Sequence, residues 1–298
     1  MSLAPAEITP VAVDGGDVAR RVGRALRSNK LMTVGLAIAL LFVVIALAAP
    51  LIAPHPADAG SATHPTAALQ APSGDHPFGT DQVGRDILTR VLYGARTSLR
   101  IAALVLLLSA LIGVPLGIAA GYFGGLIDDA IMRVTDVFLA FPALLLSLAL
   151  AAVLTPSVGN ATIAIAVTWW PWYARLARGA ATQVAGRGYI ESARALGVSP
   201  LRILGRHVLP NATTPVLVQM SLDVGGIILT AAALSFLGLG AQDPTPEWGL
   251  MVSQGQGYLN TEWWFPVFPG LAIVLAALAF NLLGDGLRQI LDPRRAAA

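Results

Sequence analysis

The sequence predicts an all-α, polytopic membrane protein with six transmembrane helices. Charged residues make up 12% of the 298 residues and hydrophobic residues 55%, whereas soluble domains average about 25% charged residues. The mean hydropathy of the chain is +0.69. Three segments carry no charged side chain, namely 31–57, 101–127 and 137–174. Each is longer than the roughly 20 residues that a helix needs to cross a bilayer.

Six apolar segments within and beyond these stretches are predicted to span the membrane. They are residues 31–53, 101–121, 137–154, 160–176, 213–239 and 265–284. The third and fourth come from one uncharged stretch, which the Pro, Gly and Asn residues of 155–160 are expected to divide by a turn. An even number of spans puts both ends of the chain on the same side of the membrane.

The placement of basic residues predicts which side that is. Of the 19 Lys and Arg residues, only Arg85, Arg90, Arg96 and Arg100 fall on the side opposite to the termini. The side richer in Lys and Arg is the cytoplasmic one under the positive-inside bias. The resulting segments are cytoplasmic tails at 1–30 and 291–298, external loops at 54–100 and 241–264, and a cytoplasmic loop at 177–211 within a membrane core of residues 101–290.

The first external segment is predicted to contain a helix. Residues 86–99 place apolar side chains on one helical stripe and put Asp86 four residues before Arg90. The stripe consists of Ile87, Leu88, Val91, Leu92, Ala95 and Leu99. We expect a helix that lies on the outer membrane surface and leads into the second span. The alternative is a solvated helix packed on the other outer loops.

Glycine spacing in the second span predicts close helix packing. Gly113, Gly117, Gly121 and Gly125 recur at every fourth position and so share one helix face. Small residues at this spacing let helix backbones approach closely in membranes. The contact is predicted within the chain or with a partner subunit, as a structural feature rather than a site.

The external loop 241–264 contains acidic and aromatic side chains but no Lys or Arg. Trp263 and Trp264 fit an interfacial aromatic belt before the sixth span. Glu247 and Trp248 are candidates for contact with a substrate or an external partner, and a loop without such a role is the alternative.

Several kinds of chemistry lack the residues they need. The sequence has no cysteine, and its four histidines all lie outside the predicted spans, which argues against a histidine base at membrane depth. Lys30 is the single lysine, and no Gly-x4-Gly-Lys-Ser/Thr nucleotide loop surrounds it. Asp223 is the one acidic residue deep within a predicted span. Such a residue faces a watery path or pairs with a neighbour, and both interpretations stay open.

Residues 189–211 are unusually polar for a segment between two spans. Ile190, Ala193 and Leu196 fall on one helix face, Glu191 can pair with Arg194, and Gly197 supplies a stop. A second helix is predicted to start at Ser199 and Pro200 and to end at Pro210, with Leu201, Leu204 and Val208 as its apolar stripe. This helix–turn–helix has too little apolar area to fold alone, so we expect it to dock on another subunit.

These residues resemble the "EAA" cytoplasmic loop of permease subunits of bacterial ABC importers. That loop reads Glu-Ala-Ala, three residues, Gly, nine residues, Ile, one residue and Leu-Pro. At these spacings the chain has Glu191, Ser192, Ala193, Gly197, Leu209 and Pro210. It departs from the pattern at Ser192, where the family has Ala, and at His207, where the family has Ile.

Four further blocks are similar to the C-type permease of dipeptide, oligopeptide and nickel importers. They are residues 76–99, 128–146, 243–251 and 283–294. Within the second block, Asp129 and Asp136 are expected to neutralise Arg133 along one helix. The resemblance covers nearly all of the chain after about residue 20 and implies the helical bundle of a type I ABC importer permease.

The resemblance also implies the partners and the site. The chain would form half of a translocation pathway with a homologous B-type permease in the bacterial inner membrane. Two ATPase subunits would bind ATP and Mg²⁺ in the cytosol, and an extracytoplasmic binding protein would deliver substrate, so no cofactor, catalytic residue, metal or nucleic acid is expected in this chain. Docking to an ATPase would involve Glu191, Ser192, Ala193, Leu196, Gly197, Leu209 and Pro210.

The cargo that the resemblance favours is a di- or oligopeptide, with nickel chelates and other small solutes as alternatives. Because Asp223 is an intramembrane carboxylate, a self-sufficient ion-coupled carrier or channel is the alternative function. An intramembrane hydrolase and a nonenzymatic scaffold are further alternatives. Of these functions, only that of an ABC importer permease requires separate ATPase subunits for transport.

Overall fold

The computed structural model describes residues 29–291, and apart from one isolated β-bridge between Thr80 and Asp86, its regular elements in that range are helices. The predicted tails lie outside this range except for residues 29, 30 and 291. The α-helices are α2 (Lys30–Ile52), α3 (Ile87–Phe123), α4 (Gly125–Leu139), α5 (Ala143–Val153), α6 (Val158–Ala185), α7 (Gly188–Ala195), α8 (Pro200–Ile203), α9 (Leu209–Phe236), α10 (Trp248–Gly255) and α11 (Trp264–Leu291). Short 3-10 turns are η1 (Pro56–Ala59), η2 (Pro65–Ala67) and η4 (Gln256–Tyr258), and Leu204–Val208 forms a π-helical turn.

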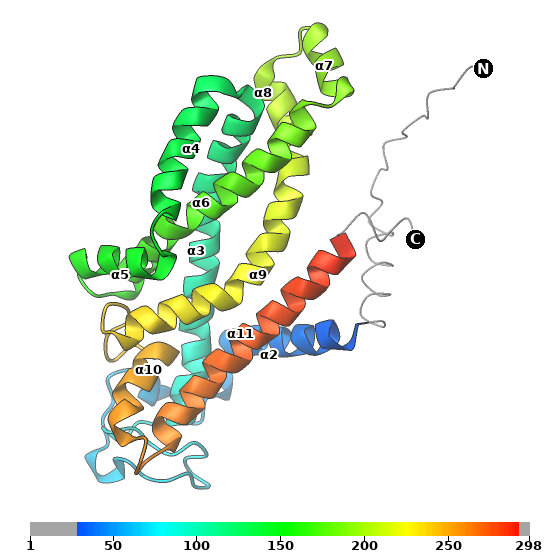
Figure 1. The fold of residues 1–298 in the computed structure, drawn as a ribbon. Helices are drawn as coiled ribbons and strands as arrows, with labels where there is room; N and C mark the ends of the chain where they lie inside the picture. The colour runs from blue at the N-terminus through cyan, green and yellow to red at the C-terminus, as the bar shows by residue number, and fades with distance from the viewer. Residues whose placement is uncertain (1–28, 292–298) are drawn as a thin grey trace.

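The long helices form an elongated bundle. α3 packs most extensively on α6, while α11 packs on α9 and α2. α7 and α8 lie at one end of the bundle, and α10 lies at the opposite end with the segment that precedes α3 (Figure 1). Any chemistry of residues 188–203 is therefore separated from that of α10 by the length of the bundle.

Four helices in the described range are long and apolar enough to cross a membrane, namely α2, α3, the continuous helix Pro200–Phe236 and α11. α4 and α5 give a fifth only if they count as one span bent by 85°. α6 is long enough at 28 residues, but its Trp, Pro and Tyr run and its two arginines lower its hydropathy. The predicted segments 31–53, 160–176, 213–239 and 265–284 are largely helical, and the number of six spans stays a prediction.

The span predicted over 137–154 is interrupted by a bend. α4 ends at Leu139 and α5 begins at Ala143, and the two helices turn by 85° at this break. Phe141 precedes Pro142, and the residue before a proline is biased away from helical backbone. The chain therefore bends where the uncharged composition alone indicated a continuous helix.

The predicted surface helix before the second span is wrong, although its residues are helical. α3 runs without a break for 37 residues, so residues 87–99 continue the axis of the span rather than lying across it. At 1.5 Å per residue the helix is about 55 Å long, well beyond the roughly 30 Å hydrocarbon core. Asp86 caps this helix by accepting the Thr89 backbone N–H at 2.7 Å, and it does not pair with Arg90.

The glycine prediction is confirmed at three of its four positions, with the contact inside the chain. A Cβ at Gly113, Gly117 or Gly121 would lie 2.2–2.4 Å from a backbone oxygen of α6. These glycines therefore let α3 and α6 touch backbone to backbone, and we name them the glycine seam. Gly125 is not part of it, because its φ is +54° and nothing lies within 4 Å of its Cβ position.

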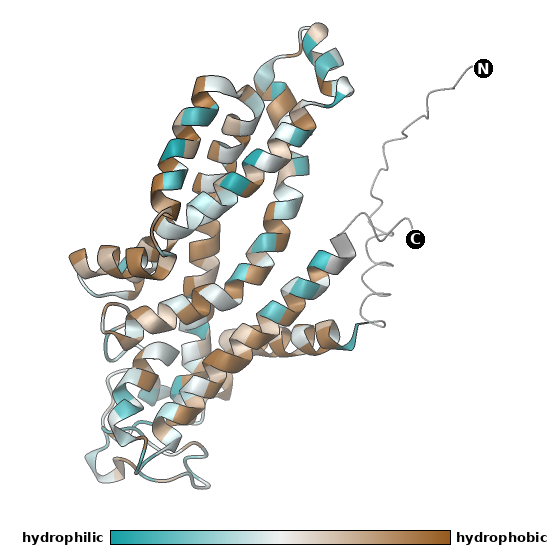
Figure 2. Cartoon of the chain, viewed as in Figure 1, coloured by the Kyte–Doolittle hydropathy of each residue, from teal (hydrophilic) through white to brown (hydrophobic). Residues whose placement is uncertain are grey.

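Large apolar side chains also cover the outside of the bundle. Leu47 in α2 is 78% exposed and Val153 in α5 is 87% exposed. Figure 2 shows hydrophobic residues through most of α5 and α11, with hydrophilic residues gathered in α7. This distribution suits helices in contact with lipid and a polar end in water.

The seam yields a matched pair of substitutions. Gly117→Ala forces a methyl group against the Ala174 carbonyl, 2.2 Å away, and overpacking of this kind costs about 1–3 kcal/mol. Gly179→Ala lies on the exposed face of α6 with nothing within 4 Å, where alanine improves helix propensity by about 1 kcal/mol.

We therefore expect thermal unfolding in detergent to show a lower Tm for Gly117→Ala and an equal or higher Tm for Gly179→Ala. Equal Tm values for Gly117→Ala and the unsubstituted chain would contradict the close contact.

Candidate functional site: the elbow and the α6–α9 cavity

The polar segment at one end of the bundle folds as the sequence predicts up to Gly197. α7 is followed by Gly197 with a φ of +77°, a conformation in which glycine is favoured. The Val198 N–H donates to the Ala193 carbonyl at 3.1 Å and closes the turn. Ile190 and Ile203 are fully buried on the two sides of this turn. We call residues 188–203 the elbow.

The second half of the segment differs from the prediction. Ser199 occupies the N-cap position of α8 with Pro200 at its first turn, but its side chain makes no capping bond. Pro210 does not end a helix, because residues 200–236 form one continuous helix. The π-helical turn makes this possible: the Leu209 N–H donates to the Leu204 carbonyl five residues back. Pro210 follows this wider turn directly, at the second residue of α9.

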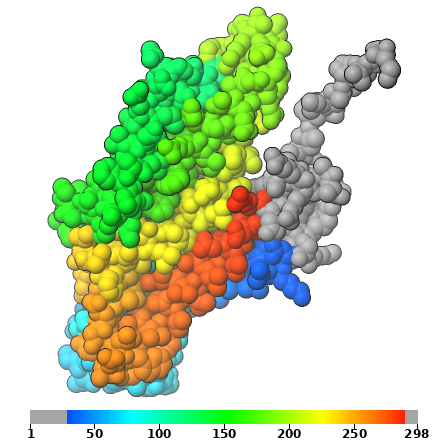
Figure 3. Space-filling view, in the orientation of Figure 1, coloured from blue at the N-terminus to red at the C-terminus, as the bar shows by residue number. Residues whose placement is uncertain are grey.

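The elbow presents leucines to solvent. Leu196 is 83% exposed and Leu201 is 80% exposed, so neither joins the buried side that their predicted stripes implied. Glu191 and Ser192 are also exposed, and Ala193 is half-buried. Figure 3 shows this part of the chain projecting at the end of the bundle.

Arg194 anchors the elbow to the bundle. Its guanidinium carbon lies 4.6 Å from the centre of the Tyr122 ring at the end of α3, a cation–π contact. Within the described residues it makes no ion pair with Glu191, contrary to the predicted pairing. The Glu191 side chain is exposed to solvent and is not held by Arg194.

A cavity of about 590 Å³ lies between α6 and α9. Its lining consists of Trp169, Trp172, Arg175, Leu176, Gln219 and Asp223. Asp223 accepts hydrogen bonds from the Tyr173 hydroxyl and the Gln219 amide, both at 2.9 Å. Asp223 therefore pairs with neighbours on α6 and α9 and also lines the cavity, while its place on a watery path stays a prediction. The tryptophans and Arg175 were not singled out by sequence reasoning, although Trp169 and Trp172 flank Pro171 in a visible cluster.

Ion pairs join α4 to α6 near this cavity. Arg178 binds the Asp128 carboxylate through two nitrogens at 2.5 and 2.6 Å, and Arg175 contacts Asp136 at 2.5 Å. Arg133 makes no ion pair among the described residues, so the predicted neutralisation along α4 is wrong. The partners of these carboxylates come from α6, because α6 packs beside α4 after the intervening α5.

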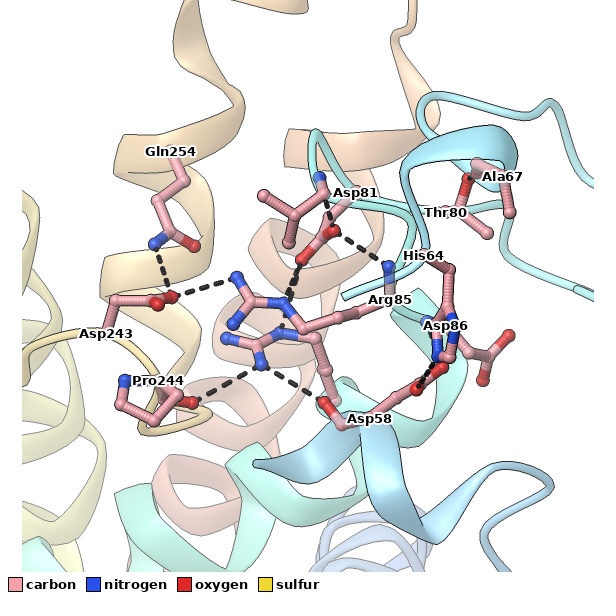
Figure 4. A network of polar contacts seen from close by, with 12 residues as sticks. Asp58, His64, Ala67, Thr80, Asp81, Arg85, Asp86, Asp243, Pro244 and Gln254 are labelled. Carbon is pink, nitrogen blue, oxygen red and sulfur yellow. Dashed lines mark hydrogen bonds and ion pairs between the residues drawn. The ribbon is translucent and has the colours of Figure 1, made fainter. Parts of the chain in front are cut away.

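A buried polar network holds the opposite end of the bundle together (Figure 4). Arg85 is 2% exposed and donates from Nε to Asp81 at 2.7 Å and from Nη2 to Asp243 at 2.8 Å. Arg90 donates from Nη1 to the carbonyls of Asp58 and Pro244 at 3.2 and 3.3 Å. Contacts from the chain before α3 thus reach the loop before α10.

These contacts perturb the pKa values of the groups outside the helices. Burial acts to raise the pKa of Asp243, but the hydrogen bond and charge of Arg85 outweigh it and lower that pKa. Burial opposes the charged form of Arg85, yet its hydrogen bonds to Asp243 and Asp81 raise its pKa. Both groups therefore stay charged at neutral pH.

Glu247 and Trp248 are buried at this end of the bundle. The Glu247 carboxylate caps α10 by accepting the Leu250 N–H at 2.9 Å and also accepts the Ser98 hydroxyl at 3.3 Å. Trp248 is fully buried and donates from Nε1 to the Val91 carbonyl at 3.0 Å. Both residues join α10 to α3, and in this structure neither offers surface to an external partner.

The sequence matches a family described as "Binding-protein-dependent transport system inner membrane component" over residues 113–297, and the "N-terminal TM domain of oligopeptide transport permease C" over residues 18–72. It is 45% identical to the dipeptide transport system permease protein DppC of Alkalihalophilus pseudofirmus, across 92% of this chain and 90% of that protein. It is 44% identical to the probable D,D-dipeptide transport system permease protein DdpC of Escherichia coli, across 90% and 89%.

The fold of this chain is similar to that of solved structures. A structure titled as an inward-facing conformation of the MetNI methionine ABC transporter aligns with a TM-score of 0.55, covering 68% of this chain and 97% of that chain. At 18% sequence identity, this likeness shows the fold alone.

Removal of Arg85 should destabilise the network, because it takes away the 2.7 Å ion pair of the buried Asp81 carboxylate and leaves only the 3.7 Å contact with Arg90. Breaking a buried pair in this way costs about 3–5 kcal/mol, so we expect Arg85→Gln to lower the Tm strongly. Arg96→Gln changes an exposed arginine of α3 and serves as the matched control, with an effect within about 0.5 kcal/mol. Similar Tm values for the two variants would exclude a stabilising role for Arg85.

Burial raises the pKa of Glu247 above its unfolded value, which is about 4.3. The unfolded chain then loses this proton first as the pH rises, so the contribution of Glu247 to stability is full below that value and declines through the folded pKa. We expect the Tm of the unsubstituted chain to fall from acid to neutral pH more than that of Glu247→Gln. Parallel Tm profiles would contradict a raised pKa of Glu247 in the folded chain.

Proposed function

Because the chain belongs to the family of inner membrane components of binding-protein-dependent transport systems, we propose that it is one permease subunit of an ATP-driven importer of di- or oligopeptides. The observation that carries this proposal is the exposed elbow between two long helices of a chain that has no nucleotide-binding loop. The dipeptide permeases to which the chain is 44–45% identical support the cargo.

Coupling to ATPase subunits is supported by the surface of the elbow. Leu196 and Leu201 flank the Gly197 hinge, and both are at least 80% exposed at a polar end of the molecule. Burying a leucine contributes about 1.5–3 kcal/mol, so two such residues favour a partner with an apolar groove. Glu191 and Ser192, exposed on the same short helix, would lie at the border of that contact.

The elbow is joined to the cavity through a single helix. Residues 200–236 are continuous, and Asp223 lies within them. A movement of the elbow would therefore move Asp223 against Tyr173 of α6. This connection supports ATP-driven switching of the pathway, with the ATP and Mg²⁺ held by the partner ATPases.

The cavity has a composition that suits a peptide. Its volume of about 590 Å³ falls in the range of small-molecule sites. A peptide has an ammonium group at one end and a carboxylate at the other. Asp223 and the faces of Trp169 and Trp172 would attract the ammonium group, and Arg175 would attract the carboxylate. A second, homologous permease would supply the other wall.

The orientation follows the same proposal. The elbow and the two tails would face the cytosol, where the ATPases are. The Arg85 network and α10 would then lie on the outer face, where a binding protein delivers substrate.

A substitution on the elbow tests the coupling. Leu196→Ser removes an apolar side chain that docking to an ATPase subunit would bury. The loss of that burial costs about 1.5–3 kcal/mol, which corresponds to roughly 10–100-fold weaker docking. We expect peptide uptake by the assembled transporter to fall at least tenfold, with less ATPase co-purified. Leu259→Ser, at an exposed leucine (52%) near α10, is the control and should leave uptake unchanged.

Full uptake by Leu196→Ser at normal abundance would contradict the docking role. Uptake against a gradient by the purified chain in vesicles, without any ATPase subunit, would instead support the self-sufficient carrier. These two outcomes separate failure of the elbow assignment from failure of the proposed function as a whole.

A further inference from the structure

Three side chains with metal-ligating atoms converge just before α3. They are His55, which precedes η1, His76 in the following loop and Asp86, the N-cap of α3. One ligand atom from each lies within 4.8 Å of the others. His76 Nδ1 donates to Asp86 Oδ1 at 3.0 Å, and His55 Nδ1 lies 3.9 Å from Asp86 Oδ2.

The His55 ring has no hydrogen bond that explains its position. Its Nδ1 atom is buried, and among the described residues it has no hydrogen-bond partner. Buried polar atoms are almost always paired, so this atom requires another explanation. The rings of His55 and His76 are 4.8 Å apart at their centres, and both Nδ1 atoms lie near the same carboxylate.

The spacing of the three ligand atoms is compatible with one shared metal ion. Zinc–nitrogen and zinc–oxygen bonds of about 2.0–2.1 Å put neighbouring ligand atoms about 3.3 Å apart. The separations of 3.0 and 3.9 Å to Asp86 bracket this value. Two imidazoles and one carboxylate suit zinc and similar divalent transition ions, whereas calcium and magnesium prefer sites made only of oxygen.

The surrounding contacts hold the ligands in place. The Thr89 N–H donates to Asp86 Oδ2 at 2.7 Å, and the Thr89 hydroxyl accepts the His55 backbone N–H at 3.1 Å. The His76 backbone N–H donates to the Ser73 hydroxyl at 3.1 Å. Such outer contacts orient metal ligands. Asp86 is fully buried, while His76 and His55 are 16% and 40% exposed, so an ion could reach the group from solvent.

The charged neighbours have partners of their own. Asp58 Oδ1 accepts from His64 Nε2 at 2.9 Å, and its Oδ2 accepts the Asp86 backbone N–H at 2.9 Å. Arg90 is directed to the Asp58 carbonyl and lies 3.7 Å from Asp81. The carboxylate of Asp86 therefore faces the two imidazoles and makes no ion pair with a Lys or Arg side chain among the described residues.

We propose that His55 Nδ1, His76 Nδ1 and the Asp86 carboxylate bind a divalent transition ion of the zinc class, with water as the fourth ligand. Binding through Nδ1 requires each imidazole to carry its single proton on Nε2, so the His76 proton that is hydrogen-bonded to Asp86 moves from Nδ1 to Nε2 by exchange with solvent, and no net proton is released. The bound ion would connect His55 and His76 to Asp86, the N-cap residue of α3. The inference is independent of the proposed transport function.

His55→Ala is the discriminating variant, because it removes one ligand whose ring makes no hydrogen bond. His64→Ala is the matched control, since it removes a histidine of the same loop that pairs with Asp58. The full chain, with any subunits that co-purify, is stripped with a chelator and titrated with zinc chloride against a fluorescent zinc indicator. Zinc that binds to other subunits contributes equally to every preparation, so it does not affect the difference in bound zinc between the variants.

We expect the unsubstituted chain and His64→Ala to bind one more zinc ion than His55→Ala, or to bind it at least about tenfold more tightly. Zinc should raise the Tm of the first two and not of His55→Ala. Equal zinc binding by His55→Ala and the unsubstituted chain, or loss of binding only in His64→Ala, would overturn the assignment.

Discussion

The backbone contact between α3 and α6 determines where the other parts of the molecule can lie. In a bilayer the lipid is as apolar as a leucine side chain, so helices associate through close packing rather than through exclusion of water. Gly113, Gly117 and Gly121 allow carbonyl groups of α6 to approach to within 2.4 Å of the Cβ positions. α6 also supplies Trp169 and Arg175 to the cavity, and its end leads directly into the elbow.

Charge is accommodated by pairing across helices. Asp128 and Asp136 of α4 bind arginines of α6, and Asp223 of α9 accepts the hydroxyl of Tyr173. Each of these contacts joins segments that are distant in sequence. The polar groups therefore add specificity to a bundle whose apolar surfaces would fit together in many ways.

Local sequence signals determined much of the fold but not the relations between elements. The glycine spacing predicted a packing face, and Gly197 predicted the stop of the elbow helix, because both follow from geometry within one helix. Pro142 is a local signal for the bend after α4, but the uncharged composition of 137–154 indicated one uninterrupted span. Pro210 indicated a helix end, because the π-helical turn that precedes it has no recognisable sequence signal. The predicted partners of Arg133 were wrong because spacing along one helix says nothing about the helix beside it. The cavity lining required the rotation of α6 and α9, which one sequence does not specify. The docking roles of the elbow residues stay predictions.

The unbroken helix from Pro200 to Phe236 has a consequence for how the chain can vary. An α-helix turns by about 100° for each residue, so one inserted residue between the elbow and Asp223 would swing that carboxylate away from Tyr173 while leaving every side chain intact. Changes in length there are compatible with the cavity only in steps that restore the angular phase. The π-helical turn could accommodate a change of one residue, because its hydrogen-bonded ring is one residue wider than that of an α-helix. The position of Asp223 in the cavity is thus linked to the elbow by the rotation about the helix axis as well as by the distance along it.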